Sequence, residues 1–174
     1  IFRVKKRPFF DPLILHVHSI DALDPLISDF PTILRKLAEA FWPGPLTLLL
    51  PRKDIVPDLT CSGLPDAAFR IPNHPLTLQL LAETGFPLAA PSANPFGYVS
   101  PTTAQHVNDQ LGSEIPYVLD GGPCAVGLES TIVGLEQGIP TIFRLGGLSI
   151  DEIQSEIGEV AIRVNQSSDP RAPG

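Results

Sequence analysis

PLAAPSANPFGYVSPTTAQHV, residues 87–107, contains the most informative change of pattern in this chain. Its first four residues, 87–90, are an apolar run of the kind that forms a buried strand. Prolines follow on both sides of two small polar residues, Ser92 and Asn94, and restrict the backbone where the strand should end. Ser100 is a good N-cap, and the proline after it suits the first helical position, so we predict that a helix follows.

The predicted order of strand, stiff polar loop and helix N-terminus is that of a binding site. It would place hydroxyls and free backbone N–H groups at the carboxyl end of a sheet, where α/β proteins bind anions. An ordinary proline-rich β–α loop explains the local pattern equally well. A site here therefore needs support from other parts of the chain.

The composition describes a single globular domain. The chain has 174 residues, of which 43% are hydrophobic, and this is enough for one domain with its own core. No apolar run approaches the roughly 20 residues of a membrane span, and no secretory signal pattern is present. We therefore expect a cytoplasmic protein without membrane contact.

The charge balance and the cysteines narrow the possible functions. A formal net charge of -7 argues against a protein that grips nucleic acid with its whole surface, although it leaves room for a local basic patch. Cys61 and Cys124 are the two cysteines. They are too few and too far apart for a disulfide framework or a zinc site, so we expect free thiols in a reducing cytosol.

The remaining sequence alternates between apolar runs and helical periodicity, which predicts a mixed α/β domain. Loops are expected at the proline- and glycine-rich positions between these runs, including residues 54–65. The predicted strands are residues 13–17, 46–50, 67–71, 117–119, 132–135, 141–143 and 160–164. The predicted helices are residues 31–41, 76–84 and the segment to residue 157 that begins with the capping box at Ser149.

Cationic and polar residues recur where predicted strands meet proline or glycine turns. Arg70 stands in an apolar context, so its guanidinium needs an anionic partner if it is buried. Lys5 and Arg7 belong to a basic turn, which is usually a solvated face, but this one leads directly into a predicted strand. The whole set is Lys5, Arg7, Arg70, Ser92, Asn94, Ser130 and Arg144. Such cations in an acidic protein indicate an anionic small molecule: a phosphate, a nucleotide or a carboxylate.

Other features of the pattern are less specific. His16 lies inside an apolar run, where a histidine is more often a core residue than a catalyst. The chain has neither GxxxxGK[ST] nor GxGxxG, which excludes a P-loop and a Rossmann site. Periodicity and spacing alone therefore lead to an anionic ligand and no further.

Six segments resemble the YrdC-like family, the threonylcarbamoyl-AMP synthases of tRNA modification. In order they are KKRPFFDPLILHV, FWPGPLTLLL, FRIPNHPL, PSANPFGYVSPTTAQHV, DGGPCAVGLESTIV and FRLGGLS, and they cover nearly the whole chain. PSAN with SPT, and GLEST followed by RxG, are together specific. The resemblance implies an α/β fold with a twisted, open, mainly parallel or mixed sheet, flanked by helices and enclosing a large concave cavity.

The resemblance also implies an activity. Members of this family convert L-threonine, bicarbonate and ATP into L-threonylcarbamoyl-AMP and pyrophosphate, a nucleotidyltransferase reaction in which Mg²⁺ accompanies ATP. The t6A-transferase machinery then passes the threonylcarbamoyl group to an adenosine of tRNA. No residue of the chain is expected to be a dedicated metal ligand.

Matching positions carry implied roles. The residues that resemble the catalytic tetrad are Lys5, Arg7, Ser92 and Asn94. Those that match ATP contacts are Arg7, Asp11, Ser92, Ser100 and Arg144, and those that match the threonine side are His16, Arg70, the Ala90 backbone and Ser130. Two positions depart from the pattern, since Asp11 stands where Asn is frequent and Asp66 where Thr is frequent.

The resemblance predicts the extent of the domain. We expect residues 1–164 to form a YrdC-like domain and residues 165–174 to begin an interdomain linker. The family opens with a strand and helix bearing a PTxTxYGL-like segment, which this chain lacks. We therefore expect a fragment of a longer two-domain protein that binds ATP weakly or not at all by itself.

Three alternative functions remain open. The chain could be the carbamoyl-AMP-forming domain of a hydrogenase-maturation carbamoyltransferase, which uses carbamoyl phosphate. It could be a module that binds double-stranded RNA or tRNA through a positive cavity, although its overall acidity counts against this. It could also be a nucleotide-binding domain without catalysis.

Overall fold

The computed structural model describes residues 1–163, 172 and 173. In chain order the helices are α1 (Phe2–Lys5), the 3-10 helix η1 (Asp21–Leu23), α2 (Thr32–Phe41), α3 (Asp58–Cys61), α4 (Pro75–Thr84), α5 (Ala104–Leu111) and α6 (Ile150–Ile157). The strands are β1 (Ile14–His16), β2 (Leu46–Pro51), β3 (Asp66–Arg70), β4 (Leu88–Ala89), β5 (Thr131–Glu136), β6 (Ile139–Arg144) and β7 (Ala161–Ile162). Residue 164 of the last predicted strand and most of the predicted linker lie outside the described residues.

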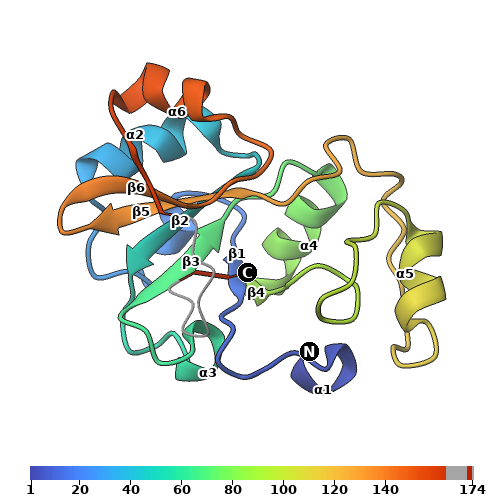
Figure 1. Cartoon of the computed structure of the whole chain (residues 1–174). Coiled ribbons are helices and arrows are strands. Elements are labelled where there is room, and N and C mark those ends of the chain that lie inside the picture. The colour runs from blue at the N-terminus through green and yellow to red at the C-terminus, as the bar shows by residue number, and fades with distance from the viewer. Residues whose placement is uncertain (164–171, 174) are drawn as a thin grey trace.

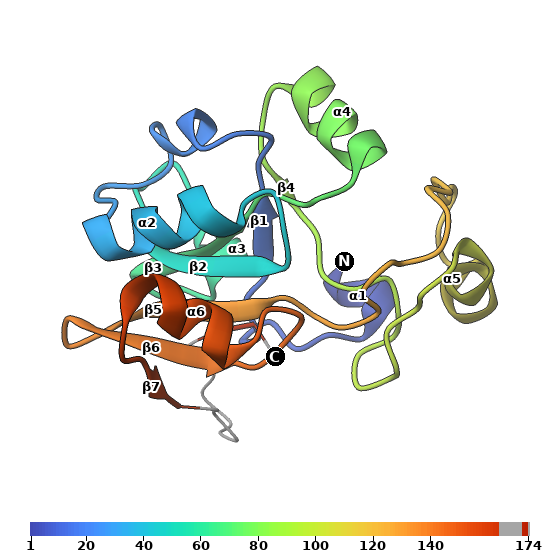
Figure 2. The same cartoon turned by 90° about the horizontal axis from the view of Figure 1, so that it is seen from above.

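The strands form one seven-stranded sheet in the order β4-β1-β3-β2-β5-β6-β7. It is a mixed sheet, because three neighbouring pairs are parallel and three are antiparallel. Helices α2 and α6 lie side by side over one face of the sheet (Figure 1). Figure 2 shows α5 well apart from the sheet, on the long segment between β4 and β5. The α/β fold class is confirmed.

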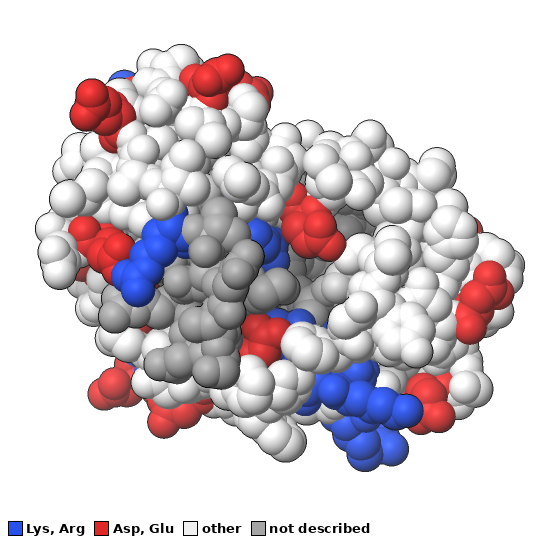
Figure 3. Space-filling view, in the orientation of Figure 1, with Lys and Arg blue, Asp and Glu red and all other residues white. Residues whose placement is uncertain are grey.

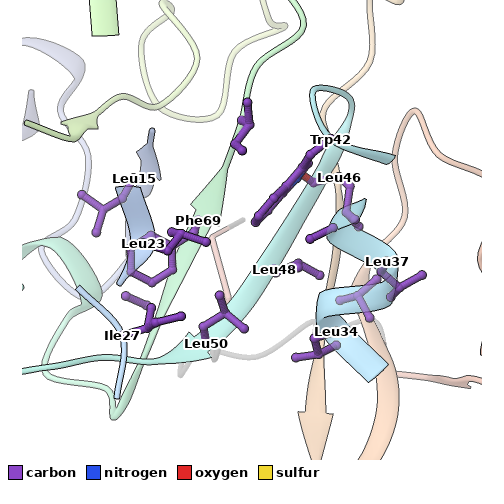
Figure 4. Packing of buried hydrophobic residues seen from close by; sticks show 14 of the residues in the cluster. Leu15, Leu23, Ile27, Leu34, Leu37, Trp42, Leu46, Leu48, Leu50 and Phe69 are labelled. Atoms are coloured by element: carbon purple, nitrogen blue, oxygen red, sulfur yellow. The ribbon is translucent and has the colours of Figure 1, made fainter. Parts of the chain in front are cut away.

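The core lies between the sheet and helix α2 (Figure 4). Alternate residues of the central strands point into it, so that Leu48, Leu50 and Phe69 are completely buried. Leu34 and Leu37 of α2 cover them from the helix side. The opposite face carries a smaller cluster: Ile14, Leu49, Ala68, Ile132, Phe143 and Ala172. Both faces of the central strands are therefore apolar, which explains their unbroken hydrophobic runs.

Local signals in the sequence predicted several elements correctly. Helix α2 follows the predicted apolar stripe, and Gly85 ends α4 in the left-handed conformation with φ 66°. The capping box is present, since the Ser149 hydroxyl accepts from Glu152 N and the Glu152 side chain accepts from Ser149 N. Within the described residues, no helix is long and apolar enough to cross a membrane.

Three local predictions were wrong. Residues 117–119 form no strand and are largely exposed; they lack a neighbouring strand to pair with, and an isolated strand is not stable. The predicted loop 54–65 contains the one-turn helix α3. The apolar run 87–90 forms only the two-residue, half-buried β4, which pairs antiparallel with β1 at the edge of the sheet.

The predicted N-cap at Ser100 was also wrong. Helix α5 begins three residues later than expected, after Thr103, whose hydroxyl accepts a hydrogen bond from His106 N over 3.2 Å. Thr103 replaces Ser100 as the N-cap because its hydroxyl can accept the same hydrogen bond and it lies directly before the helical pattern. The Ser100 hydroxyl is consequently available for a different contact.

Candidate functional site

A cavity of about 490 Å³ opens between the sheet and the segment that carries α5, a volume within the range of small-molecule sites. The carboxyl ends of β1 and β3 form one wall, since His16 and Arg70 are both last residues of their strands. The loops around residues 90–92, 100–101 and 124–130 form the rest, together with Arg144 at the end of β6. Parallel β1 and β3 thus deliver their carboxyl ends to the cavity. The loop after residues 87–90 also borders it, but it does not follow a parallel strand as predicted, because β4 runs antiparallel to β1.

Three arginines border the cavity, and backbone carbonyl groups hold each of them in place. Arg7 donates to the carbonyl groups of Asp11 and Pro12, at 3.2 and 2.7 Å. Arg70 Nε donates to the carbonyl of Gly44 over 2.9 Å. Arg144 donates through Nε and Nη2 to the carbonyl of Ser130, at 3.1 and 2.9 Å. Fixed guanidinium groups of this kind are suited to carboxylate or phosphate ligands.

Burial lowers the pKa of all three arginines. The pKa of Arg144 falls to about 10, first through burial and also through the nearby positive charges of Arg70 and Arg7. It still carries its charge at neutral pH. Among the described residues, no acidic side chain forms an ion pair with Arg70. The cavity therefore concentrates positive charge inside an acidic protein.

The residues of the implied tetrad divide into two pairs. Arg7 and Ser92 border the cavity, but Lys5 and Asn94 do not. Lys5 is buried behind the loop, and its Nζ donates to the backbone carbonyl groups of Ser92 and Asn94. The Asn94 side chain donates to the carbonyl groups of Pro95 and Tyr98, at 3.2 and 2.7 Å. Lys5 and Asn94 therefore hold the shape of the PSAN loop, whereas Arg7 and Ser92 face the ligand space.

Lys5 has an unusual protonation equilibrium. Its pKa is lowered to about 8, chiefly by burial and then by the charge of Arg7, with Asp11 acting in the opposite direction. An ammonium group that loses its proton near pH 8 makes the PSAN loop sensitive to moderately alkaline conditions.

The four residues predicted for the threonine side come together around one cavity, two from strand ends and two from loops. His16, Arg70, Ala90 and Ser130 all border the cavity, and the parallel pairing of β1 with β3 places His16 opposite Arg70. Burial and the charge of Arg70 lower the pKa of His16 to about 4, so its ring is neutral. Its buried Nδ1 has no hydrogen-bond partner among the described residues. A neutral imidazole beside a guanidinium suits a ligand with both a carboxylate and polar hydrogen-bonding groups.

Ser130 is fixed from several directions. Its hydroxyl lies 2.7 Å from Thr47 Oγ1 and accepts from Arg144 Nη2 over 3.0 Å. Gly146 packs against its backbone so closely that a Cβ there would lie 2.5 Å from the Ser130 carbonyl carbon. The glycine of the RLGG segment thus permits the close approach that supports Ser130.

Glu129 is a site residue that we did not single out from the sequence. It borders the cavity, and its Oε1 accepts a hydrogen bond from the Ser100 hydroxyl over 2.6 Å. This hydrogen bond is the main reason why the pKa of Glu129 is lowered. The signal that could have identified Glu129 was its place within the GLEST segment. Asn73 and Cys124, also on the cavity wall, were likewise not proposed as site residues.

The two departures from the family pattern have different consequences. Asp11 does not border the cavity, and it pairs with Arg7 from behind. Asp66 begins β3, whose last residue is Arg70, so it lies roughly 13 Å from that end of the strand at 3.3 Å per residue. Asp66 is therefore remote from the cavity.

Comparison with known proteins shows the family. The family model described as telomere recombination, Sua5/YciO/YrdC, matches residues 1–146. The chain belongs to the Sua5/YciO/YrdC family. Among the Sua5/YciO/YrdC proteins, threonylcarbamoyl-AMP synthase of Pyrococcus abyssi (strain GE5 / Orsay) is 43% identical over 162 residues, which cover 93% of this chain and 48% of that protein. Threonylcarbamoyl-AMP synthase of Bacillus subtilis (strain 168) is 40% identical over 178 residues, which cover 100% of this chain and 51% of that protein.

A solved structure of the Sua5/YciO/YrdC family has the same fold. The crystal structure of P. abyssi Sua5 complexed with L-threonine matches with a TM-score of 0.95 and 40% identity, covering 99% of this chain and 52% of that one. The chain therefore spans about half the length of the curated relatives it matches.

Proposed function

We propose that the protein to which this chain belongs is an L-threonylcarbamoyladenylate synthase. It would form threonylcarbamoyl-AMP and pyrophosphate from L-threonine, bicarbonate and ATP for t6A formation in tRNA. The observation that carries this proposal is one cavity in which three fixed arginines face serine hydroxyls and a neutral histidine. The relatives named threonylcarbamoyl-AMP synthase and the L-threonine complex of P. abyssi Sua5 support it.

The cavity walls divide between the two substrates. On the sheet wall, Arg70 would pair with the threonine carboxylate. His16 on the same wall, with Ser130 and the backbone of Ala90 from the adjoining loops, would contact the rest of the amino acid. The ATP phosphates would lie against Arg7, Ser92 and Arg144, with Ser100 beside them, and all four residues border the cavity. Lys5 would contribute positive charge from behind the loop, and Asn94 would hold the loop's shape.

The proposed reaction needs positioning more than a protein nucleophile. The amino nitrogen of threonine attacks the carbon of bicarbonate, and loss of water leaves a carbamate. A carbamate oxygen then attacks the α-phosphorus of ATP, and the bond to the bridging oxygen breaks as pyrophosphate leaves. Arginines fixed before the substrates bind would offset the charge that develops on the phosphates. The proline-bounded loops hold these groups in place.

In this proposal Mg²⁺ accompanies ATP as part of the substrate. Within the described part of the chain, no three His, Cys, Asp or Glu side chains gather to hold an ion, and Glu129 is the acidic residue that borders the cavity. Mg²⁺ would therefore be held mainly by ATP oxygens and water. No step of the proposed reaction is assigned to it.

The domain boundaries, cellular location and partners belong to the same proposal. Residues 1–164 would form the synthase domain, residues 165–174 would begin a linker, and the t6A-transferase machinery would receive the product. A cytoplasmic location fits the two free cysteines. Arg3 and Lys6 are exposed at or next to α1, where Figure 3 shows a basic patch, and this patch would contact tRNA phosphates.

Pyrophosphate release tests the proposal. The protein with its full natural chain is given ATP and bicarbonate together with L-threonine, L-serine or carbamoyl phosphate. Release that requires both L-threonine and bicarbonate is expected. Release with carbamoyl phosphate instead would indicate a carbamoyltransferase. No release with any of the three would contradict catalysis, and salt-dependent retention of double-stranded RNA would then identify an RNA-binding module.

A further inference from the structure

Thr47 lies directly behind Ser130. It belongs to β2, is completely buried and does not border the cavity. Its Oγ1 lies 2.7 Å from the Oγ of Ser130. Parallel pairing of β2 with β5, with Leu46 opposite Thr131, holds the two hydroxyls within the rigid centre of the sheet. Thr47 can therefore act on a bound ligand only through Ser130.

The surrounding hydrogen bonds determine which hydroxyl is the donor. A hydroxyl offers one hydrogen and two acceptor lone pairs. Arg144 Nη2 uses one lone pair of Ser130 by donating to it over 3.0 Å. Within the described part of the chain, Ser130 is the one hydrogen-bond partner of Thr47 Oγ1. If Ser130 donated to Thr47, the hydrogen of Thr47 would be unpaired in the core, which is a costly arrangement.

We infer that Thr47 is a positioning residue that donates to Ser130 and thereby leaves the Ser130 hydrogen to point into the cavity. Both lone pairs of Ser130 are then occupied, one by Thr47 and one by Arg144. Ser130 is consequently a donor toward the ligand and never an acceptor. The ligand atom that it recognises must be an acceptor, such as a carboxylate or carbamate oxygen, which agrees with the charges of Arg70 and Arg144.

This inference rests on the proposed function, because it assigns the hydrogen-bond direction of Ser130, which would contact L-threonine. It also accounts for the local geometry, in which three separate groups constrain one serine residue. Arg144 and Thr47 contact the hydroxyl itself, and Gly146 packs against its backbone. Without Thr47, the hydroxyl could rotate and offer the ligand a lone pair instead of a hydrogen.

The first test compares Thr47→Val with Thr47→Ser in the full natural chain. Valine has nearly the same shape without the hydroxyl, and serine keeps the hydroxyl. We expect Thr47→Val to raise the KM for L-threonine about tenfold, as for loss of one hydrogen bond to a charged group. The KM for ATP should change little, and Thr47→Ser should restore most of the threonine affinity. An equal rise in both KM values, or a wild-type KM for L-threonine, would overturn the inference.

Thr141→Val is the matched control. Thr141 is buried like Thr47, at 1% and 0% exposed respectively. Its hydroxyl donates to the carbonyl of Ile139 over 3.0 Å, away from the cavity. This substitution should lower the melting temperature about as much as Thr47→Val and leave both KM values unchanged. A selective threonine effect in Thr47→Val therefore cannot arise from general destabilisation.

A double-mutant cycle shows whether Thr47 acts through Ser130. If it does, the variant carrying both Thr47→Val and Ser130→Ala should have the same KM for L-threonine as Ser130→Ala alone. Additive effects would contradict the inference. Calorimetric titration of these variants with L-threonine alone gives the affinity ratios without catalysis. A protein that binds L-threonine but releases no pyrophosphate would contradict the proposed function, while the affinity ratios would still decide the role of Thr47. A wild-type protein that does not bind L-threonine would contradict both.

Discussion

Arg7 and Asp11 form a buried ion pair, with Nη2 of the arginine 2.9 Å from Oδ1 of the aspartate and each side chain 5% exposed. The aspartate lies behind the arginine and outside the cavity. It therefore offsets part of the positive charge that Arg7 presents to the ligand space. The pair is therefore a testable feature of this chain.

Asp11→Asn should strengthen ATP binding and weaken the fold. Removing the carboxylate leaves more of the Arg7 charge for the phosphates, so the Kd for ATP should fall several-fold. The same change leaves a buried guanidinium without its counter-ion, which should lower the unfolding free energy by about 1–3 kcal/mol. Calorimetry gives the Kd, and denaturant titration gives the stability. A weaker affinity for ATP would contradict this account of the pair.

Asp66→Asn is the matched control and has its own pH dependence. Asp66 lies at the far end of β3, so the Kd for ATP should not change. Burial raises the pKa of its carboxyl group, which means that the folded state loses stability as pH rises through that pKa. Asparagine cannot ionise. The variant should therefore be more stable than the wild type at neutral pH, with the advantage disappearing in acid. A stability difference that stays constant between about pH 3 and about pH 7, the range in which a carboxyl group titrates, would rule out this role of ionisation.

Lys5 should set an alkaline limit on ATP binding. Its pKa is lowered to about 8, first by burial, so the ammonium charge is present below that pH and is lost as pH rises through it. The affinity for ATP, measured by equilibrium binding, should decline above about pH 8. Lys5→Arg keeps its charge and should flatten the decline, even if its affinity is lower throughout. Lys6→Arg, at the exposed neighbouring position, should retain the wild-type profile.

Arg70 should discriminate between the two substrates. Arg70→Gln should raise the KM for L-threonine roughly 10- to 100-fold, the range for loss of a hydrogen bond between charged groups, with a much smaller effect on ATP. Arg52→Gln is the control, because Arg52 donates to the carbonyl groups of Leu64 and Val56 away from the cavity. Equal KM changes in the two variants would show that Arg70 has no specific role toward L-threonine.

Ser92 and Asn94 should behave differently although the family motif joins them. Ser92→Ala should raise the KM for ATP without changing the melting temperature, because Ser92 is an exposed residue on the cavity wall. Asn94→Ala removes two hydrogen bonds inside the loop and should lower the unfolding free energy by about 1–3 kcal/mol. Thermal unfolding and ATP titration of both variants check the distinction. Unchanged stability in Asn94→Ala would contradict a loop-holding role.

The fold class, most elements and several residues of the cavity wall were predictable from the amino-acid sequence. Apolar periodicity predicted α2, the capping box predicted the start of α6, and the apolar runs predicted the central strands. These signals are local, because a helix cap depends on residues within one turn and an apolar run is visible in consecutive residues. The cations at the turns also predicted an anionic site, since a charge in an apolar context requires a partner.

The role of each site residue, by contrast, depends on contacts between distant parts of the chain. Residues 117–119 look like a strand but form none, since strand formation needs a partner from elsewhere in the chain. The pairing of Ser100 with Glu129 and of Thr47 with Ser130 joins residues 29 and 83 positions apart. Arg7 and Ser92 border the cavity, whereas Lys5 and Asn94 lie behind it. The orientation of these side chains and the distances between them depend on how the sheet packs, and no local sequence pattern encodes them.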